Sequence, residues 1–123
     1  MIQIQPVDDK VALQALCRAA GITYSDAMRG ALMRDGKTRL GYALFACFDG
    51  YAVIHALEPA DDLALADGML RSIIHMALRS NCFSVYYADT APEAVFTQLG
   101  FVMNPKEKQL NTHKLFETCG GCN

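Results

Sequence analysis

The first half of the chain is organised in short runs of apolar residues that alternate with polar ones, which is typical of β-strands. These runs cover residues 2–6, 27–33, 38–48 and 51–57. The dipeptides Asp35-Gly36 and Asp49-Gly50 separate the last three runs, and both are tight-turn signals because Gly tolerates a positive φ. The pattern therefore predicts a strand followed, after an intervening segment, by an antiparallel meander.

Two other segments repeat apolar residues at helical spacing. Asp8 or Asp9 can N-cap a helix that continues to residue 20, and Gly21 suits the position after its end. A longer helix is expected over residues 65–79. Its apolar face has two adjacent rows at i, i+4 spacing: Met69, Ile73 and Ala77 in one, Leu70, Ile74 and Leu78 in the other.

The last third of the chain predicts a return to the sheet. Residues 82–88 are strand-like, with Phe83, Val85 and Tyr87 on one face. The tetrapeptide 90–93 matches a capping box with Pro in the first turn, which predicts a short helix over 92–99 that ends at Gly100. A strand is expected over 101–103, and a final one fits 114–117.

The predicted order is β α β β β α β α β. The meander gives antiparallel pairs, and the helical crossover before residue 82 gives a parallel pair. The fold class is therefore α/β (α+β), with a mixed, mostly antiparallel central sheet flanked by helices. No repeat or linker divides the chain, so we expect one domain over 1–123, with 119–123 as a flexible C-terminal tail.

The composition limits the classes of partner that we expect this chain to bind. Hydrophobic residues make up 52% of the chain and charged residues 20%, with a formal net charge of -2. No cluster of Lys and Arg is present, so nucleic acid is not an expected partner. No apolar stretch approaches the roughly 20 residues of a membrane helix, and no signal peptide is visible. We therefore expect a soluble cytoplasmic protein in which Cys17, Cys47 and Cys82 are small buried hydrophobic residues.

One short motif carries a family resemblance. Phe96-Thr97-Gln98-Leu99-Gly100-Phe101 resembles the aromatic-x-x-Leu-Gly-Phe ending of the last helix in the GNAT superfamily of N-acetyltransferases. The predicted element order resembles that fold over nearly the whole chain. The resemblance implies transfer of an acetyl group from acetyl-CoA to an amine of a small molecule or peptide. A homodimer is a further partner that it allows.

The resemblance also assigns a cofactor loop. In the family, backbone N–H groups before and within a helix bind the coenzyme A pyrophosphate. Carried onto this chain, the cofactor-binding positions are Leu57, Ala64, Leu65 and Ala66. The loop is degenerate, because Asp61 stands where the family has Arg or Gln and Ala64 replaces a Gly. The alternative interpretation, which the residues favour, is that Asp61 or Asp62 caps the helix.

The catalytic positions are assigned in the same way. Phe96 stands where many members have a Tyr that protonates the departing thiolate, and Phe cannot donate a proton. His55 is predicted to share a strand face with Val53 and Leu57, and its ordinary pKa suits a general base. We therefore take His55 as the candidate catalytic base. The alternative is a packed or partly exposed histidine with a hydrogen-bonded ring.

Cys119 and Cys122 form a C-x-x-C near the C-terminus, with His113 before them. Such a pair can supply two zinc ligands or a redox couple, although a closed zinc site needs four ligands. A flexible tail is the favoured interpretation, and a metal is not expected. Three functions stay open: an acetyltransferase, a non-catalytic GNAT-like binding or dimerisation module, and a metal- or thiol-sensing protein.

Overall fold

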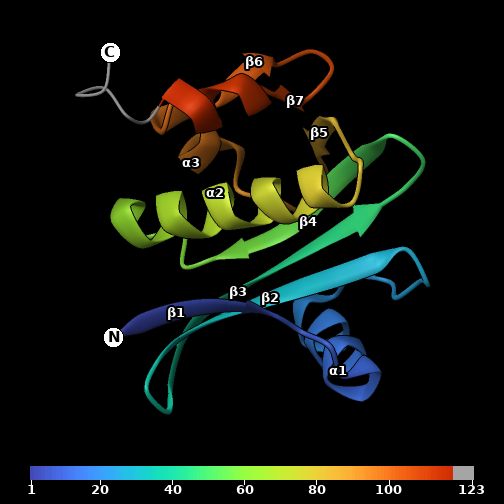
Figure 1. Ribbon diagram of the computed structural model, residues 1–123, viewed down its shortest axis with the longest axis vertical. Coiled ribbons are helices and arrows are strands. Elements are labelled where there is room, and N and C mark those ends of the chain that lie inside the picture. Colours follow the sequence, from blue (N-terminus) through green and yellow to red (C-terminus); the bar gives the residue numbers. More distant parts are fainter. Residues whose placement is uncertain (118–123) are drawn as a thin grey trace.

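The computed structural model describes residues 1–117, which form one seven-stranded sheet in the order β1-β2-β3-β4-β5-β7-β6 (Figure 1). The strands are β1 (Ile2–Pro6), β2 (Met28–Asp35), β3 (Thr38–Cys47), β4 (Tyr51–Glu58), β5 (Ser84–Tyr87), β6 (Val102–Asn104) and β7 (Gln109–Leu110). The helices are α1 (Lys10–Ala20), α2 (Leu63–Arg79) and α3 (Glu93–Gln98), followed by the 3-10 helix η1 (Thr112–Glu117). Among the strands of residues 1–117, only β4 and β5 pair in parallel. The predicted mixed, mostly antiparallel sheet is confirmed.

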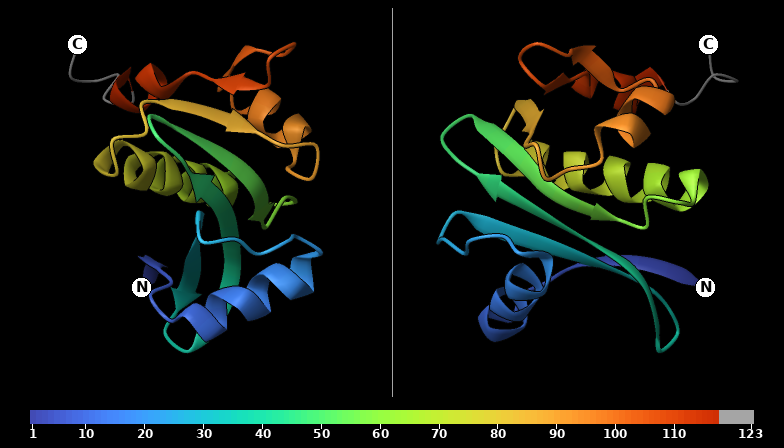
Figure 2. Two further views of the ribbon diagram at one scale, coloured as in Figure 1. Left: turned by 90° about the vertical axis from the view of Figure 1, so that its right-hand side faces the viewer. Right: turned by 180° about the vertical axis from the view of Figure 1, so that it is seen from behind.

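Helices cover both faces of the sheet. Helix α1 lies on the opposite face from α2, as the rotated views show (Figure 2). The alternation along β3 connects the two layers: Phe45 packs in the cluster beneath α2 and α3, whereas Leu44 packs in the cluster beneath α1. The strands in the middle of the sheet are therefore buried on both sides, and they provide a rigid base for the site described below.

The local signals for turns and helix starts are confirmed. Gly36 and Gly50 have φ angles of 62° and 86°, as the two turn dipeptides predicted. Asp9 caps α1 through its side chain, which accepts a hydrogen bond from the Val11 N–H at 2.9 Å. Asp62 caps α2, which begins at Leu63, two residues before the predicted start.

Three local predictions are wrong. Thr90 does not cap α3: its hydroxyl bonds across the sheet, and α3 has no side-chain cap. Phe83 is 63% exposed, because β5 begins only at Ser84 and Cys82 takes the buried place before it. The predicted last strand over 114–117 is part of η1, and the short strand β7 precedes it.

Gly41 fixes the approach of β3 to the end of β4. A Cβ atom at this position would lie 2.1 Å from the carbonyl oxygen of Glu58 and 2.7 Å from the Pro59 ring. Only a glycine admits that contact. The close approach holds the β4–α2 connection against the sheet, and this connection is the predicted cofactor loop.

Candidate functional site

The site is built where β4 and β5 separate. Their parallel pairing runs from Tyr51 opposite Ser84 to Ile54 opposite Tyr87, and the Ala88 N–H then donates to the Ile54 carbonyl at 2.9 Å. Strand β4 continues for four further residues without pairing to β5 in the described chain. In an open sheet that contains parallel strands, ligands bind beyond the carboxyl ends of these strands.

His55 lies at a β-bulge at this point of separation. The β3–β4 register passes from Leu44 opposite Ala56 directly to Phe45 opposite Ile54, so His55 is the extra residue on β4. The bulge corrects a prediction: Leu57 does not share the face of Val53 and His55. Leu57 is 2% exposed and packs beneath α2 with Ile54, because one extra residue inverts the alternation of the strand.

The backbone and the side chain of His55 have different surroundings. Its carbonyl oxygen accepts a hydrogen bond from the Thr90 hydroxyl at 2.6 Å, which ties β4 to the β5–α3 loop. The imidazole is half-buried and has no hydrogen-bond partner among residues 1–117. Burial lowers the pKa of His55 below its ordinary value of 6.5, so the ring is neutral at neutral pH. A neutral imidazole at an opening in the sheet can accept a proton.

In the predicted cofactor loop, Asp62 caps helix α2 and bonds to an N–H group of its first turn. The Asp62 carboxylate accepts a hydrogen bond from the Leu65 N–H at 3.1 Å, and the Asp62 carbonyl accepts one from the Ala66 N–H at 2.9 Å. The interpretation of Asp62 as a cap is confirmed. Leu63 and Ala64 remain exposed at the start of this 17-residue helix, whereas Ala66 is fully buried.

Phe96 is a core residue without any exposed surface. Its ring packs edge to face against Tyr87, with 5.4 Å between the ring centroids. The Tyr87 hydroxyl donates to a carboxylate oxygen of Glu93 at 2.7 Å. Burial, and then the Glu93 carboxylate, raise the pKa of Tyr87 to about 12. The Glu93 side chain thus bonds to Tyr87 instead of closing a capping box. This is the second reason why the predicted capping box over residues 90–93 is wrong.

An aromatic recess lies on the sheet at the other end of β4 and β5. It has a volume of about 590 Å³ and is lined by Asp49, Gly50, Tyr51, Val53, Ser84, Tyr86 and Glu107. The rings of Phe48 and Tyr51 stack at 5.0 Å, and Tyr86 meets Tyr51 edge to face at 6.2 Å. Val53, two residues before His55, lines the recess. No local pattern along the chain indicates this recess, because Glu107 comes from the distant β6–β7 loop.

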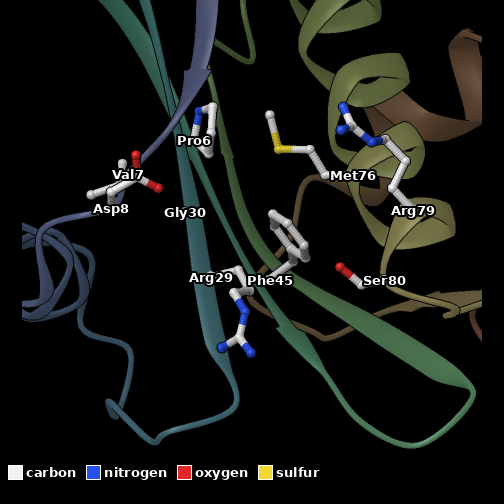
Figure 3. A pocket seen from close by; sticks show the side chains of 9 residues that line it. All are labelled: Pro6, Val7, Asp8, Arg29, Gly30, Phe45, Met76, Arg79 and Ser80. Atoms are coloured by element: carbon white, nitrogen blue, oxygen red, sulfur yellow. The ribbon is translucent and has the colours of Figure 1, made fainter.

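A second pocket lies between β2 and the C-terminal end of α2 (Figure 3). Its volume is about 370 Å³, and Arg29, Phe45, Arg79 and Ser80 are among its lining residues. This pocket contains neither His55 nor the start of α2. It is therefore separate from the site at the β4–β5 opening.

Cys119 and Cys122 lie outside the described residues, and His113 is exposed. Residues 1–117 contain no group of three or more His, Cys, Asp or Glu side chains that could hold a metal ion. Over the same residues, no helix has the length and apolar character needed to cross a bilayer.

Comparison with known proteins supports the fold. No family model and no curated protein matches the sequence. Among solved structures, the ribosomal-protein-S18-alanine N-acetyltransferase from Escherichia coli aligns over 89% of this chain and 88% of its own, with a TM-score of 0.58 and 11% identity. A mutant of the AtaT toxin, bound to the C-terminus of the antitoxin AtaR, aligns over 96% of both chains, with a TM-score of 0.59 and 15% identity.

These likenesses concern the three-dimensional fold. Together with the element order and the motif 96–101, they show that the chain has the GNAT acyl-CoA N-acyltransferase fold. The fold identified from the sequence is confirmed. The function has to be argued from the residues at the opening, because one fold can host several activities.

Proposed function

We propose that the protein is an N-acetyltransferase that moves an acetyl group from acetyl-CoA to an amine of a small molecule or peptide. The observation that carries the proposal is the opening between β4 and β5, with the neutral, half-buried His55 at its bulge. Acetyl transfer to an amine needs a positioned thioester and a group that takes the ammonium proton. The opening and His55 supply a place for each.

The exposed start of α2 suits the pyrophosphate of acetyl-CoA, but the negative charge of Asp62 opposes its binding. Ala64 and Leu63 are exposed at the start of a long helix, where backbone N–H groups favour an anion. The Asp62 carboxylate competes for the same place, since it already accepts the Leu65 N–H. The pyrophosphate would be held by the helix start with Asp62 turned away, and we therefore expect weak binding.

In this reaction, His55 accepts the proton of the attacking amine, directly or through a water. Thr90 positions β4 by bonding to the His55 carbonyl. Phe96 cannot protonate the leaving thiolate, so that proton comes from water. Acetyl-CoA supplies the activated acetyl group, and the chain supplies positioning and the base.

The aromatic recess extends to Val53, two residues before His55, and suits a cationic group of the acceptor other than the reacting amine. Asp49 and Glu107 place two carboxylates at its lining, beside the rings of Tyr51 and Tyr86. Ammonium groups bind to such aromatic faces and are attracted by nearby carboxylates.

A non-catalytic binding module is the second candidate. The observations that favour it are the Asp62 cap at the cofactor loop and the buried Phe96 in place of a proton donor. This candidate predicts that acetyl-CoA does not bind.

Mass-spectrometric detection of acetyl transfer to a panel of amines and N-terminal peptides tests the proposal. We expect His55→Gln to lower kcat/KM by about 100-fold, the usual contribution of a general base. His75→Gln, a change at an exposed histidine of α2, is the matched control and should leave the rate unchanged. Equal rates in the two variants would remove His55 from the mechanism.

A further inference from the structure

The pocket of Figure 3 lies on the sheet face that carries α2, at the place where this helix ends. Its walls come from three elements: Pro6 ends β1, Arg29 and Gly30 belong to β2, and Met76 and Arg79 belong to α2. A neighbouring hollow of about 470 Å³ shares Pro6, Met76 and Arg79 with this pocket. The pocket is therefore one end of a longer groove between β1 and α2.

The surface between the walls is apolar. Phe45 is the cross-strand partner of Arg29 in the β2–β3 ladder, and its side chain is only 3% exposed. In the view of Figure 3, the Phe45 ring lies between Arg29 and the helix residues Met76 and Arg79. The pocket volume of about 370 Å³ falls within the roughly 300–1,000 Å³ of small-molecule sites, which are mostly apolar with a few polar groups. This surface suits the apolar body of a small ligand.

The charged side chains of the pocket favour an anion. Arg29 and Arg79 line it from β2 and from α2, and Asp8 supplies the single carboxylate among its lining residues. Positive charge is therefore in excess, on two separate walls. A concave site lined by one sign of charge attracts ligands of the opposite sign.

The two arginines have hydrogen-bonding capacity to spare. One terminal nitrogen of Arg29, Nη1, donates to the carbonyls of Asp26 at 3.0 Å and Met28 at 2.8 Å, which holds the guanidinium in place. Its other nitrogens have no partner among residues 1–117, and the Arg79 guanidinium has none there either. A guanidinium presents a planar set of donors that matches a carboxylate.

The end of α2 opposes an anion only weakly. The carbonyls at a helix C-terminus carry partial negative charge when they have no partner. Here the carbonyls of Met76 and Ala77 accept the Ser80 N–H at 3.2 and 3.0 Å, and the Leu78 carbonyl accepts the Asn81 N–H at 3.0 Å. The guanidinium of Arg79, the last residue of α2, adds positive charge at the same end.

We propose that this pocket binds small dicarboxylates with an apolar body, with one carboxylate on Arg29 and the other on Arg79. The apolar surface at Phe45 separates the two guanidiniums, so a molecule with two anionic ends and an apolar middle uses all three features. The bound ligand would join β2 to the end of α2 and stabilise the folded chain. This site is independent of acetyl transfer, because neither His55 nor the start of α2 lines it.

The test uses the full chain and para-phenylenediacetate, which carries two carboxylates on one benzene ring. Titration at low salt, followed in amide NMR spectra, should shift the signals of Gly30 and Ser80, with a Kd on the order of 1 mM. The monocarboxylate para-tolylacetate should bind about fivefold more weakly, and the neutral para-phenylenediacetamide more weakly again by a similar factor. Absence of these shifts up to about 10 mM, or equal affinity for the three molecules, would overturn the proposal.

Variants assign the two carboxylates. Arg29→Gln and Arg79→Gln should each weaken binding of the dicarboxylate about fivefold and bring it to the affinity of the monocarboxylate. Arg34→Gln changes an exposed arginine of β2 outside the pocket and is the matched control, with affinity unchanged. The amide spectrum of each variant shows whether it is folded. Unchanged affinity in folded Arg29→Gln or Arg79→Gln contradicts the two-arginine site.

Discussion

The Thr90 hydroxyl donates a hydrogen bond of 2.6 Å to the carbonyl oxygen of His55, across the point where β4 and β5 separate. This contact replaces the next rung of the parallel ladder after the Ala88–Ile54 bond. It holds the bulged residue at the opening, because the backbone of His55 is anchored while its side chain is not. The position of the candidate base therefore depends on a residue of the β5–α3 loop.

Loss of this hydrogen bond should affect both stability and rate. We expect Thr90→Val to lower the free energy of unfolding by about 1 kcal/mol, the usual net value of such a bond. It should also lower kcat, whereas Thr90→Ser should restore both quantities. Urea unfolding and the transfer assay measure the two effects. Thr97→Val, which removes a bond within α3 to the Glu93 carbonyl, is the control for a hydroxyl whose loss spares the rate.

Two glycines should respond in opposite ways to alanine. Gly41→Ala would place its Cβ atom 2.1 Å from the Glu58 carbonyl, so the β4–α2 connection must move, and we expect a loss of at least about 3 kcal/mol. Gly68→Ala, inside α2, meets only Ile4 at 4.0 Å and should raise stability by about 1 kcal/mol. Thermal unfolding compares them directly. A neutral Gly41→Ala would show that the connection does not depend on the close approach.

Helix caps and turns were predictable because their signals are local. Asp9, Asp35-Gly36 and Asp49-Gly50 act within a few residues, and the structure bears out all three. The bulge at His55 was not predictable, since it depends on the register between β3 and β4. The local pattern predicts Thr90 as a cap, whereas its hydroxyl bonds to His55 on another strand. A local pattern does not show such a distant partner.

The cysteines show the same limit. Cys47 and Cys82 were both expected to be small buried hydrophobic residues, and Cys82 is indeed fully buried. Cys47, the last residue of β3, is only half-buried, and the sequence pattern does not show this difference. The aromatic recess likewise combines β4, β5 and the β6–β7 loop.

Asp62 should control the affinity for acetyl-CoA. Asn caps a helix as well as Asp does but carries no charge. Since a carboxylate near a pyrophosphate costs roughly 1–4 kcal/mol, Asp62→Asn should tighten binding by about tenfold, with stability unchanged. Asp62→Ala should lose about 1 kcal/mol of stability as well. Weaker binding by the Asn variant would place the coenzyme elsewhere.

The pH dependence of the rate should reflect the low pKa of His55. The neutral ring is the active base, and burial shifts its pKa below 6.5. The acid limb of kcat/KM should therefore fall below pH 6.5. Stability should also decrease as pH falls from 6.5 through the lowered pKa, because the unfolded chain binds the proton more tightly. An acid limb above pH 7 would contradict this assignment.

The carboxylates of the recess should act on the acceptor. Glu107→Gln and Asp49→Asn should each raise KM for a cationic amine about threefold to tenfold at low salt, with kcat unchanged. The effect should shrink as salt increases. Asp8→Asn, at the pocket of Figure 3, is the matched control and should leave KM unchanged. A change in kcat with KM unchanged would show that these two carboxylates do not bind the acceptor.

Calorimetric titration of the purified protein with acetyl-CoA tests the central claim most directly. The GNAT fold and the exposed start of α2 predict one saturable site with a Kd on the order of 100 μM or tighter, despite Asp62. Absence of binding up to about 1 mM would contradict the acetyltransferase proposal and favour a non-catalytic module with this fold.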